Sequence, residues 1–212
     1  MNSELEGPHE SPFVTALGPA LDKAAPVVKA HLTMDQPTAL YSGFLRRIYR
    51  SGGPWTWFVA KALKLEDTRK RGEGRQSFEL RNQLLDPHPG EYPTMVWNRI
   101  SRNGSKTTNA RGHMRWDPRY GVLIDSTGPW RCIDVELLPS VDSEGAVVLT
   151  SRRQWLRVMG CRFRLPRCFV GFAHTREWEE PEGKIGLSLT LSHPLLGEYA
   201  GYEAILEKRG TS

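Results

Sequence analysis

The chain has 212 residues, of which 39% are hydrophobic and 25% are charged, and 29 basic against 24 acidic side chains give a net charge of +5. This composition is typical of a globular protein and excludes a disordered one. The near balance of charges argues against a nucleic-acid binder. The three cysteines are odd in number and lack C-x-x-C spacing, which predicts reduced thiols.

The N-terminus is acidic and has no apolar segment of the kind that a signal peptide requires. No run of the sequence reaches the roughly 18 apolar residues of a membrane span. Together with the predicted thiols, these features lead us to expect a cytoplasmic protein without a membrane span.

Helical spacing dominates the start of the chain. Residues 1–11 are rich in Gly, Pro and charged side chains and are predicted to form a flexible tail. From Phe13 to Leu32, apolar residues recur every three or four positions. Because Pro19 and Pro26 interrupt this stripe, we expect two or three short helices.

One strand and one further helix follow. Leu40–Tyr49 is aromatic and β-branched enough to form a strand, and Trp55–Leu65 has the apolar spacing of an amphipathic helix. We therefore divide a single globular domain, 12–209, into a helical N-terminal part, 12–65, and a β meander, 76–207.

From residue 76 onward, apolar and polar residues alternate, which is the period of a β-strand. Turn signals such as Asn103-Gly104 separate the segments, and their shortness predicts an antiparallel meander. A sheet of this many strands normally curls or closes into a barrel. We therefore predict an α+β, mainly β fold: a curved antiparallel sheet or lipocalin-like barrel of about nine strands, with short N-terminal helices packed on it. The candidate strands are Gln76–Leu85, Thr94–Arg102, Lys106–Trp116, Tyr120–Asp125, Trp130–Leu138, Ala146–Val158, Cys161–Leu165, Phe169–Trp178, Lys184–His193 and Glu198–Glu207.

Several strands combine aromatic rings with Arg or His on one face. Trp97 and Arg99 have the same parity, His113 lies between two arginines of its face, and His174 shares its face with aromatic residues. A sheet that holds a ligand mixes rings with a few polar anchors. We therefore take Arg99, His113 and His174 as candidate catalytic donors. The candidate ligand-binding residues are Trp97, Trp116, Trp130, Trp155, Phe172, Arg176 and Trp178.

Each of these positions also fits a structural role. Arg99 can stack on surface rings or pair with an acid, and His113 can lie on a solvated strand face. Asp134 and Glu136 have the parity opposite to an aliphatic face, so they either point to solvent or line a lumen. In a lumen, burial would raise their pKa values and make them candidate general bases.

Motifs for common cofactors are absent from the sequence. No phosphate loop and no G-x-G-x-x-G after a strand is present, and neither H-E-x-x-H nor G-x-S-x-G occurs. We therefore expect no cofactor and no metal.

Three stretches carry a family resemblance. The first is Leu17-Gly18-Pro19-Ala20-Leu21-Asp22 with Val27, Val28 and His31, and the second is the Gly43 strand leading through Gly52-Gly53 to the next helix. The third is Trp97-x-Arg99 with Gly128-Pro129, Leu195-Leu196-Gly197, Tyr199 and Gly201. In these the chain resembles an uncharacterised domain family, found alone or fused behind saccharopine-dehydrogenase-like reductases. The resemblance implies a shared fold, and members of such sets have been recruited as cofactor-free cyclases. The chain departs from the family by carrying Trp55 and Trp57 in place of an Arg-rich helix and Asp125 in place of Glu.

Three functions remain. The first is a cofactor-independent cyclase or isomerase of pericyclase type, which would fold an apolar natural product and polarise it by hydrogen bonding. The second is a carrier of an apolar ligand or an accessory domain of an oxidoreductase. The third is an anion or nucleic-acid binder using the arginines of 152–167, which ranks last because arginines of both parities face opposite sides.

Overall fold

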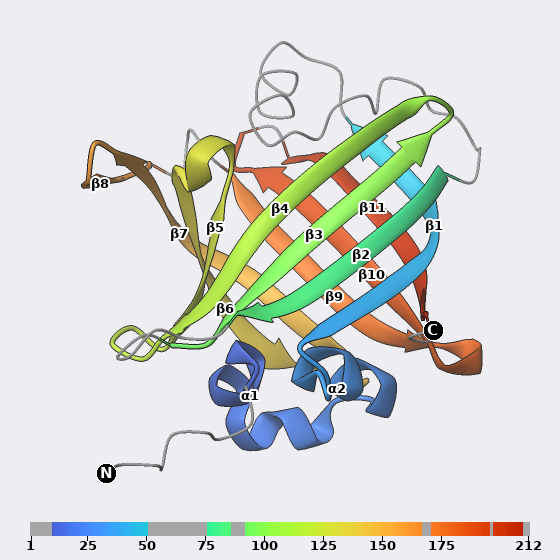
Figure 1. Ribbon diagram of the computed structural model, residues 1–212. Helices are drawn as coiled ribbons and strands as arrows, with labels where there is room; N and C mark the ends of the chain where they lie inside the picture. The colour runs from blue at the N-terminus through green and yellow to red at the C-terminus, as the bar shows by residue number, and fades with distance from the viewer. Residues whose placement is uncertain (1–9, 51–75, 86–91, 167–170, 196, 210–212) are drawn as a thin grey trace.

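In the computed structural model, residues 10–50, 76–85, 92–166, 171–195 and 197–209 are described. Within them, eleven antiparallel strands form a single sheet (Figure 1). The strands are β1 (Thr38–Arg50), β2 (Gln76–Leu85), β3 (Thr94–Asn103), β4 (Lys106–Asp117), β5 (Val122–Thr127), β6 (Ile133–Val141), β7 (Val147–Val158), β8 (Cys161–Arg164), β9 (Phe172–Glu180), β10 (Lys184–His193) and β11 (Gly197–Lys208).

The sheet closes into a barrel of ten strands. Its order is β6-β5-β4-β3-β2-β1-β11-β10-β9-β7, and a further pairing of β6 with β7 joins the two ends. β8 pairs with β7 and lies outside the ring. Closure satisfies the backbone groups that would otherwise form exposed edges.

The predicted antiparallel barrel is confirmed, but the predicted number of about nine strands is too low. Leu40–Tyr49 was assigned to the helical N-terminal part, whereas β1 pairs with both β2 and β11 and completes the ring. β8 corresponds to the predicted strand Cys161–Leu165 and lies outside the ring. The predicted helix Trp55–Leu65 lies outside the described residues.

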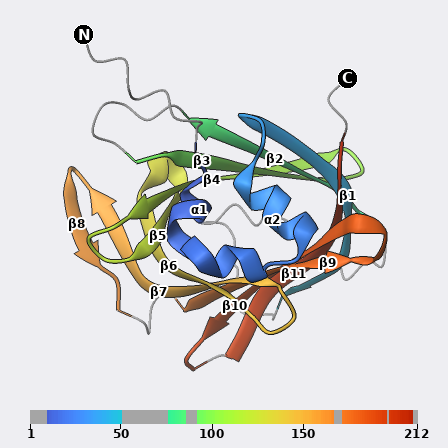
Figure 2. The ribbon, with the colours of Figure 1, turned by 90° about the horizontal axis from the view of Figure 1, so that it is seen from below.

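Three short helices cover one end of the barrel, as seen from below in Figure 2. They are α1 (Pro12–Leu17), the 3₁₀ helix η1 (Gly18–Lys23) and α2 (Pro26–Thr33). Each has a proline in its first turn, where the missing N–H costs nothing. The prediction of two or three short helices is confirmed. Two further 3₁₀ turns are η2 (Pro129–Arg131) and η3 (Pro181–Gly183).

The helices fill the lower interior of the barrel. Phe13 of α1 stacks on Trp97 of β3 with ring centroids 5.8 Å apart, which identifies the Trp97 face of β3 as the inner one. Burying each large apolar side chain contributes about 1.5–3 kcal/mol. This core includes Phe13, Leu17, Leu21, Val28 and Leu32 of the helices with Tyr41, Leu80, Met95, Leu123, Leu187 and Leu206 of the strands.

No helix in the described part of the chain is both long and apolar enough to cross a membrane. Cys132 and Cys161 are free thiols, in agreement with the expectation for these two cysteines. Cys168 lies outside the described residues.

Candidate functional site

The inward-facing side chains change character with distance from the helices. Along β3, Met95 and Trp97 are buried, but Arg99, two residues further on, is partly accessible. On β11, the same change occurs between Ala204 and Tyr202. We call this partly accessible inner surface the upper interior. Strand parity and register assign to it Ile48, Arg99, Ala110, Asp125, Val135, Leu156, Ala173, Leu189 and Tyr202.

Polar side chains interrupt this surface: Thr175 and Gln154 lie in register with Leu189 and Val135, and three further polar side chains interact with one another. Arg99 comes from β3, Asp125 from β5 and Tyr202 from β11. The Arg99 Nη1 donates a hydrogen bond to Tyr202 Oη over 3.4 Å, and its guanidinium attracts the Asp125 carboxylate. Gly112 of β4 leaves room for this carboxylate, because a Cβ there would lie 2.5 Å from Asp125 Oδ1.

The electrostatics of this group shift the pKa values of Asp125 and Arg99. Burial raises the pKa of Asp125 above its ordinary value, while the Arg99 guanidinium opposes that rise. Burial also lowers the pKa of Arg99, but Tyr202 and Asp125 outweigh it, so its pKa is raised and it stays charged. Among the described residues, Asp125 Oδ1 and Arg99 Nε have no hydrogen-bond partner. Both atoms are themselves buried, and their hydrogen-bonding capacity is unused within the described residues.

A second polar group lies deeper, against the helices. His31 of α2 places its Nε2 3.5 Å from Glu177 Oε2 of β9 and 3.4 Å from Asn82 Nδ2 of β2. Burial raises the pKa of Glu177 to about 8 and lowers that of His31 to about 3, with the charge of Lys208 adding to the second effect. At pH 7 this contact therefore places a neutral carboxylic acid against a neutral imidazole between α2 and the barrel wall, and neither Glu177 oxygen has a hydrogen-bond partner among the described residues.

Of the residues predicted to form the site, Trp97, Arg99 and Trp116 point inward. Trp97 is buried under α1, Trp116 packs against the same core, and Arg99 belongs to the upper interior. The Trp97 indole N–H donates to the Met95 sulfur over 2.6 Å. Trp97 therefore serves the core, and Arg99 is the predicted donor that reaches the upper interior.

The other two predicted donors lie on the outer surface of the barrel. His113 has the parity opposite to Gly112, and burial under outer side chains lowers its pKa to about 4, with Arg131 and Arg111 adding to the effect. His174 is exposed and lies in register with Thr150 and Thr190. The fold therefore does not bring Arg99, His113 and His174 together.

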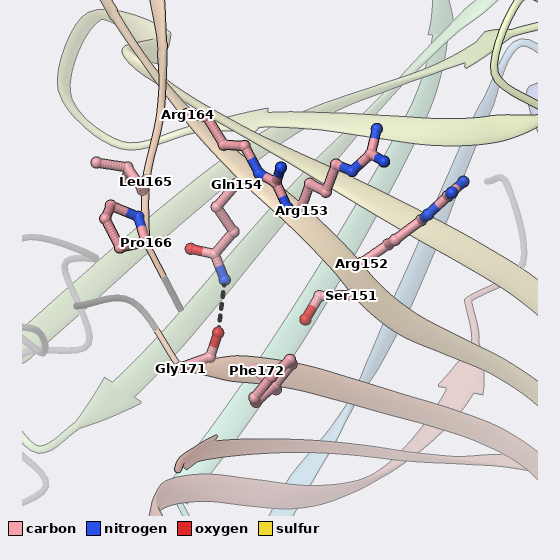
Figure 3. A pocket seen from close by; sticks show the side chains of 9 residues that line it. All are labelled: Ser151, Arg152, Arg153, Gln154, Arg164, Leu165, Pro166, Gly171 and Phe172. Atoms are coloured by element: carbon pink, nitrogen blue, oxygen red, sulfur yellow. Dashed lines mark hydrogen bonds between the residues drawn. The ribbon is translucent and has the colours of Figure 1, made fainter. Parts of the chain in front are cut away.

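The predicted ring residues of β9 also face outward. Arg176 forms an ion pair with Asp142 at 3.0 Å, and its guanidinium stacks on the Trp178 ring at 5.5 Å. The Trp178 indole N–H donates to Glu180 over 2.9 Å. Phe172, at the start of this strand, lines a separate pocket (Figure 3).

Trp130 and Trp155 complete the predicted set on the outside. Trp130 is 97% exposed in η2. The Trp155 indole N–H donates to Glu136 over 2.7 Å, and Arg162 stacks on its ring. Neither residue belongs to the upper interior.

Asp134 and Glu136 fit neither of the two environments expected for them. Both are buried on the outer face, beneath side chains of β7 and β8. Asp134 accepts a hydrogen bond from Ser126 Oγ over 2.7 Å and lies 3.3 Å from the Arg162 guanidinium. These carboxylates therefore link neighbouring strands on the outer face of the barrel.

Sequence reasoning missed the inward carboxyl groups Asp125 and Glu177 as site residues. Asp125 shares the parity of the buried Leu123, which is a signal that the sequence contains. Glu177 lies on the face opposite to the aromatic residues of its strand. The aromatic residues therefore suggested the wrong face of β9 as the inner one. No group of three or more potential metal ligands occurs among the described residues.

Comparison with known families adds one match. The model of a domain of unknown function, DUF4166, matches residues 25–206, which extend from the start of α2 into the last strand. The chain belongs to the DUF4166 family. This confirms the resemblance to an uncharacterised domain family, and α1 and η1 lie before the matched range of the DUF4166 domain. A search of curated proteins finds no match.

Proposed function

We propose that this DUF4166 protein binds an apolar small molecule in the upper interior and catalyses its cofactor-independent isomerisation or cyclisation. The observation that carries the proposal is the inner surface itself, where Arg99, Asp125 and Tyr202 converge among apolar side chains. Apolar surroundings with a few placed polar groups are typical of small-molecule sites. A pericyclase-type reaction of natural-product metabolism, such as a cycloaddition, fits this composition.

The chemistry asks little of the protein. Apolar side chains such as Leu189 and Val135 would hold the substrate in a reactive conformation, and Arg99 with the Tyr202 hydroxyl would polarise a carbonyl. In an isomerisation, Asp125 takes a proton from one carbon and returns a proton to another, which its raised pKa favours. In a cycloaddition it donates a hydrogen bond only. Neither reaction consumes an oxidant or a reductant.

The alternative is a non-catalytic carrier of an apolar ligand, or an accessory domain of an oxidoreductase. One observation favours it: Arg99 is already engaged by Tyr202 and Asp125. A guanidinium that is held in this way can orient a ligand without promoting a reaction.

The test uses an extract of apolar metabolites from the source cells. Native mass spectrometry identifies the retained compound, and chromatography with mass detection compares it before and after incubation. A product of unchanged mass and altered mobility supports an enzyme, and an unaltered ligand supports the carrier. If nothing is retained, the proposal fails.

Matched variants locate the site. Ala110→Phe should abolish retention by filling the upper interior, and Asp125→Asn should preserve retention but slow conversion by about 100-fold, as is typical for loss of a general acid–base. His174→Ala is the control on the outer face and should change neither. Loss of conversion in His174→Ala alone would move the site to the outside of β9.

A further inference from the structure

β7 changes partners halfway along its length. Its first half pairs with β9 as far as Thr150, opposite His174, and its second half pairs with β8 from Trp155 onward. Between them, the register with β6 shifts, since Ser151 lies opposite Leu137 and Arg153 opposite Glu136, so Arg152 is an extra residue. A bulge of this kind bends a strand and interrupts its ladder. We call the space where β8 and β9 diverge from β7 the fork.

Side chains take the place of the ladder in the fork. Ser151 Oγ accepts a hydrogen bond from the Ala173 N–H over 2.8 Å, and Gln154 Nε2 donates to the Gly171 carbonyl over 3.1 Å. These two backbone groups are hydrogen-bonded, but the strands stay apart, and a pocket of about 180 Å³ remains between them. The pocket is lined by Ser151, Arg152, Arg153, Gln154, Arg164, Leu165, Pro166, Gly171 and Phe172 (Figure 3).

The arginines of this pocket differ from others in the protein. Arg46 lies 2.8 Å from Glu203, and Arg176 lies 3.0 Å from Asp142. In contrast, no carboxylate of the described residues lies within ion-pair distance of the three pocket arginines, which are Arg152, Arg153 and Arg164.

One acidic residue is a neighbour of this group in sequence register. Glu136 lies opposite Arg153 on β6, but its Oε1 accepts the Trp155 indole N–H instead. Among the described residues, the three arginines of the fork therefore have no ion-pair partner and can bind an external anion. Leu165, Pro166 and Phe172 provide apolar surface in the same pocket.

We infer that the fork binds the anionic head group, a carboxylate or a phosphate, of an amphipathic small molecule. Arginine suits both groups because the N–H donors of its planar guanidinium match two oxygens at once. The volume equals that of about six waters at roughly 30 Å³ each, and it is smaller than the roughly 300–1,000 Å³ of pockets that enclose a whole ligand. The lining of the pocket is mostly apolar, and the Arg152 and Arg153 side chains extend away from Phe172 (Figure 3). The pocket therefore takes the start of the apolar chain against Phe172, and the arginines beside it bind the head group. This inference does not depend on the interior site.

The experiment titrates the full chain with decyl phosphate and decanoate below their micelle concentrations, followed by calorimetry and by the amide shifts of Gly171 and Ala173. We expect one site per chain, binding at least about tenfold tighter than that of neutral 1-decanol, because a hydrogen bond to a charged group contributes about 1.5–3 kcal/mol. Arg164→Gln and Arg153→Gln should each weaken binding about tenfold. Phe172→Ala should weaken decyl phosphate binding and spare inorganic phosphate.

Two controls make the result decisive. Arg115→Gln removes the same charge from the exposed outer face of β4 and should have no effect. Ala110→Phe, which fills the upper interior, should also leave binding intact. Equal losses in Arg115→Gln and Arg164→Gln would show unspecific attraction, and loss in Ala110→Phe would place the amphiphile inside the barrel. Either result overturns the inference.

A second arm identifies the source of the head group. Vesicles of phosphatidylglycerol in phosphatidylcholine are added to the complex with decyl phosphate. If these vesicles displace the amphiphile and vesicles of pure phosphatidylcholine do not, the result supports a membrane lipid as the donor of the head group. Retention of the amphiphile supports a free soluble ligand.

Discussion

His31 of α2 and Glu177 of β9 meet inside the barrel, with 3.5 Å between Nε2 and Oε2 and exposed side-chain fractions of 1% and 2%. Burial keeps both groups neutral, since it raises the pKa of Glu177 to about 8 and lowers that of His31 to about 3. A neutral acid thus faces a neutral base at the contact between the helices and the barrel wall. The stability of this contact depends on pH in opposite ways for the two partners.

Glu177 should make the protein less stable as pH rises. Its pKa is about 8 in the folded state against 4.5 in the unfolded state, so its favourable contribution is complete below pH 4.5 and is lost as pH rises through 8. The whole difference corresponds to roughly 5 kcal/mol, at about 1.4 kcal/mol per pKa unit. Denaturant unfolding of Glu177→Gln and wild type should therefore give curves that diverge between pH 5 and 8, with the variant gaining. Glu179→Gln, two residues further along the same face of β9 but exposed, should follow the wild type at every pH.

Phe13 should anchor the helices to the barrel. It is fully buried against Trp97, so Phe13→Ala leaves a cavity and should lower the free energy of unfolding by about 3–5 kcal/mol. Thr15→Ala on the exposed side of α1 is the matched control and should change stability by less than about 1 kcal/mol. Equal effects of the two substitutions in thermal unfolding would contradict the packing of α1 into the barrel.

Arg99 and Asp125 should be energetically coupled. Arg99→Met removes the cation that lowers the pKa of Asp125, so the pKa of that carboxyl rises further and a buried charge loses its partner. We expect a double-mutant cycle with Asp125→Leu to give a coupling of at least about 1 kcal/mol. The comparison is the exposed pair of Arg102 and Glu79 on β3 and β2, where solvent screens the charges and the coupling should be smaller. A coupling near zero for Arg99 and Asp125 would show that the interior charges do not interact.

Ser151 should hold β9 to β7 at the fork. Its Oγ accepts the Ala173 N–H, and no ladder bond replaces this contact if the hydroxyl is lost. Ser151→Ala should therefore speed hydrogen exchange of the Ala173 amide about tenfold, which corresponds to about 1.4 kcal/mol of local stability. Thr150→Ala, one residue earlier and exposed, should leave the exchange rate unchanged. Equal rates in the Ser151→Ala variant and the wild type would disprove this role.

The strands and helices were predictable because their signals are local. Alternation and turn residues place each strand within a few residues of its observed bounds, and Pro19 and Pro26 divide the helices where the structure divides them. Which strands close the ring is not a local property. Leu40–Tyr49 was recognised as a strand, but only its partners β2 and β11 show that it completes the barrel.

The candidate site was predictable in part. Trp97 and Arg99 were assigned to one face, and that face is the inner one. On β9, the aromatic residues suggested an inner face, but they lie on the outer face of the barrel. Trp178 packs there over Gly186, where a Cβ would lie 2.1 Å from its ring. A ring in a strand thus indicates a packed surface and not which side it belongs to. Asp125 is a site residue because it interacts with Arg99 two strands away, and no local sequence pattern shows this interaction.

The pairing of β1 with β11 joins Tyr41 to Lys208, near the two ends of the described chain. During synthesis, the ring therefore stays open until β11 has left the ribosome. Until then, the inner faces of β1 and β2 lack their final cover. Contacts between residues this far apart in sequence slow folding, so the nascent barrel should depend on chaperones for longer than a protein whose neighbouring strands are all consecutive.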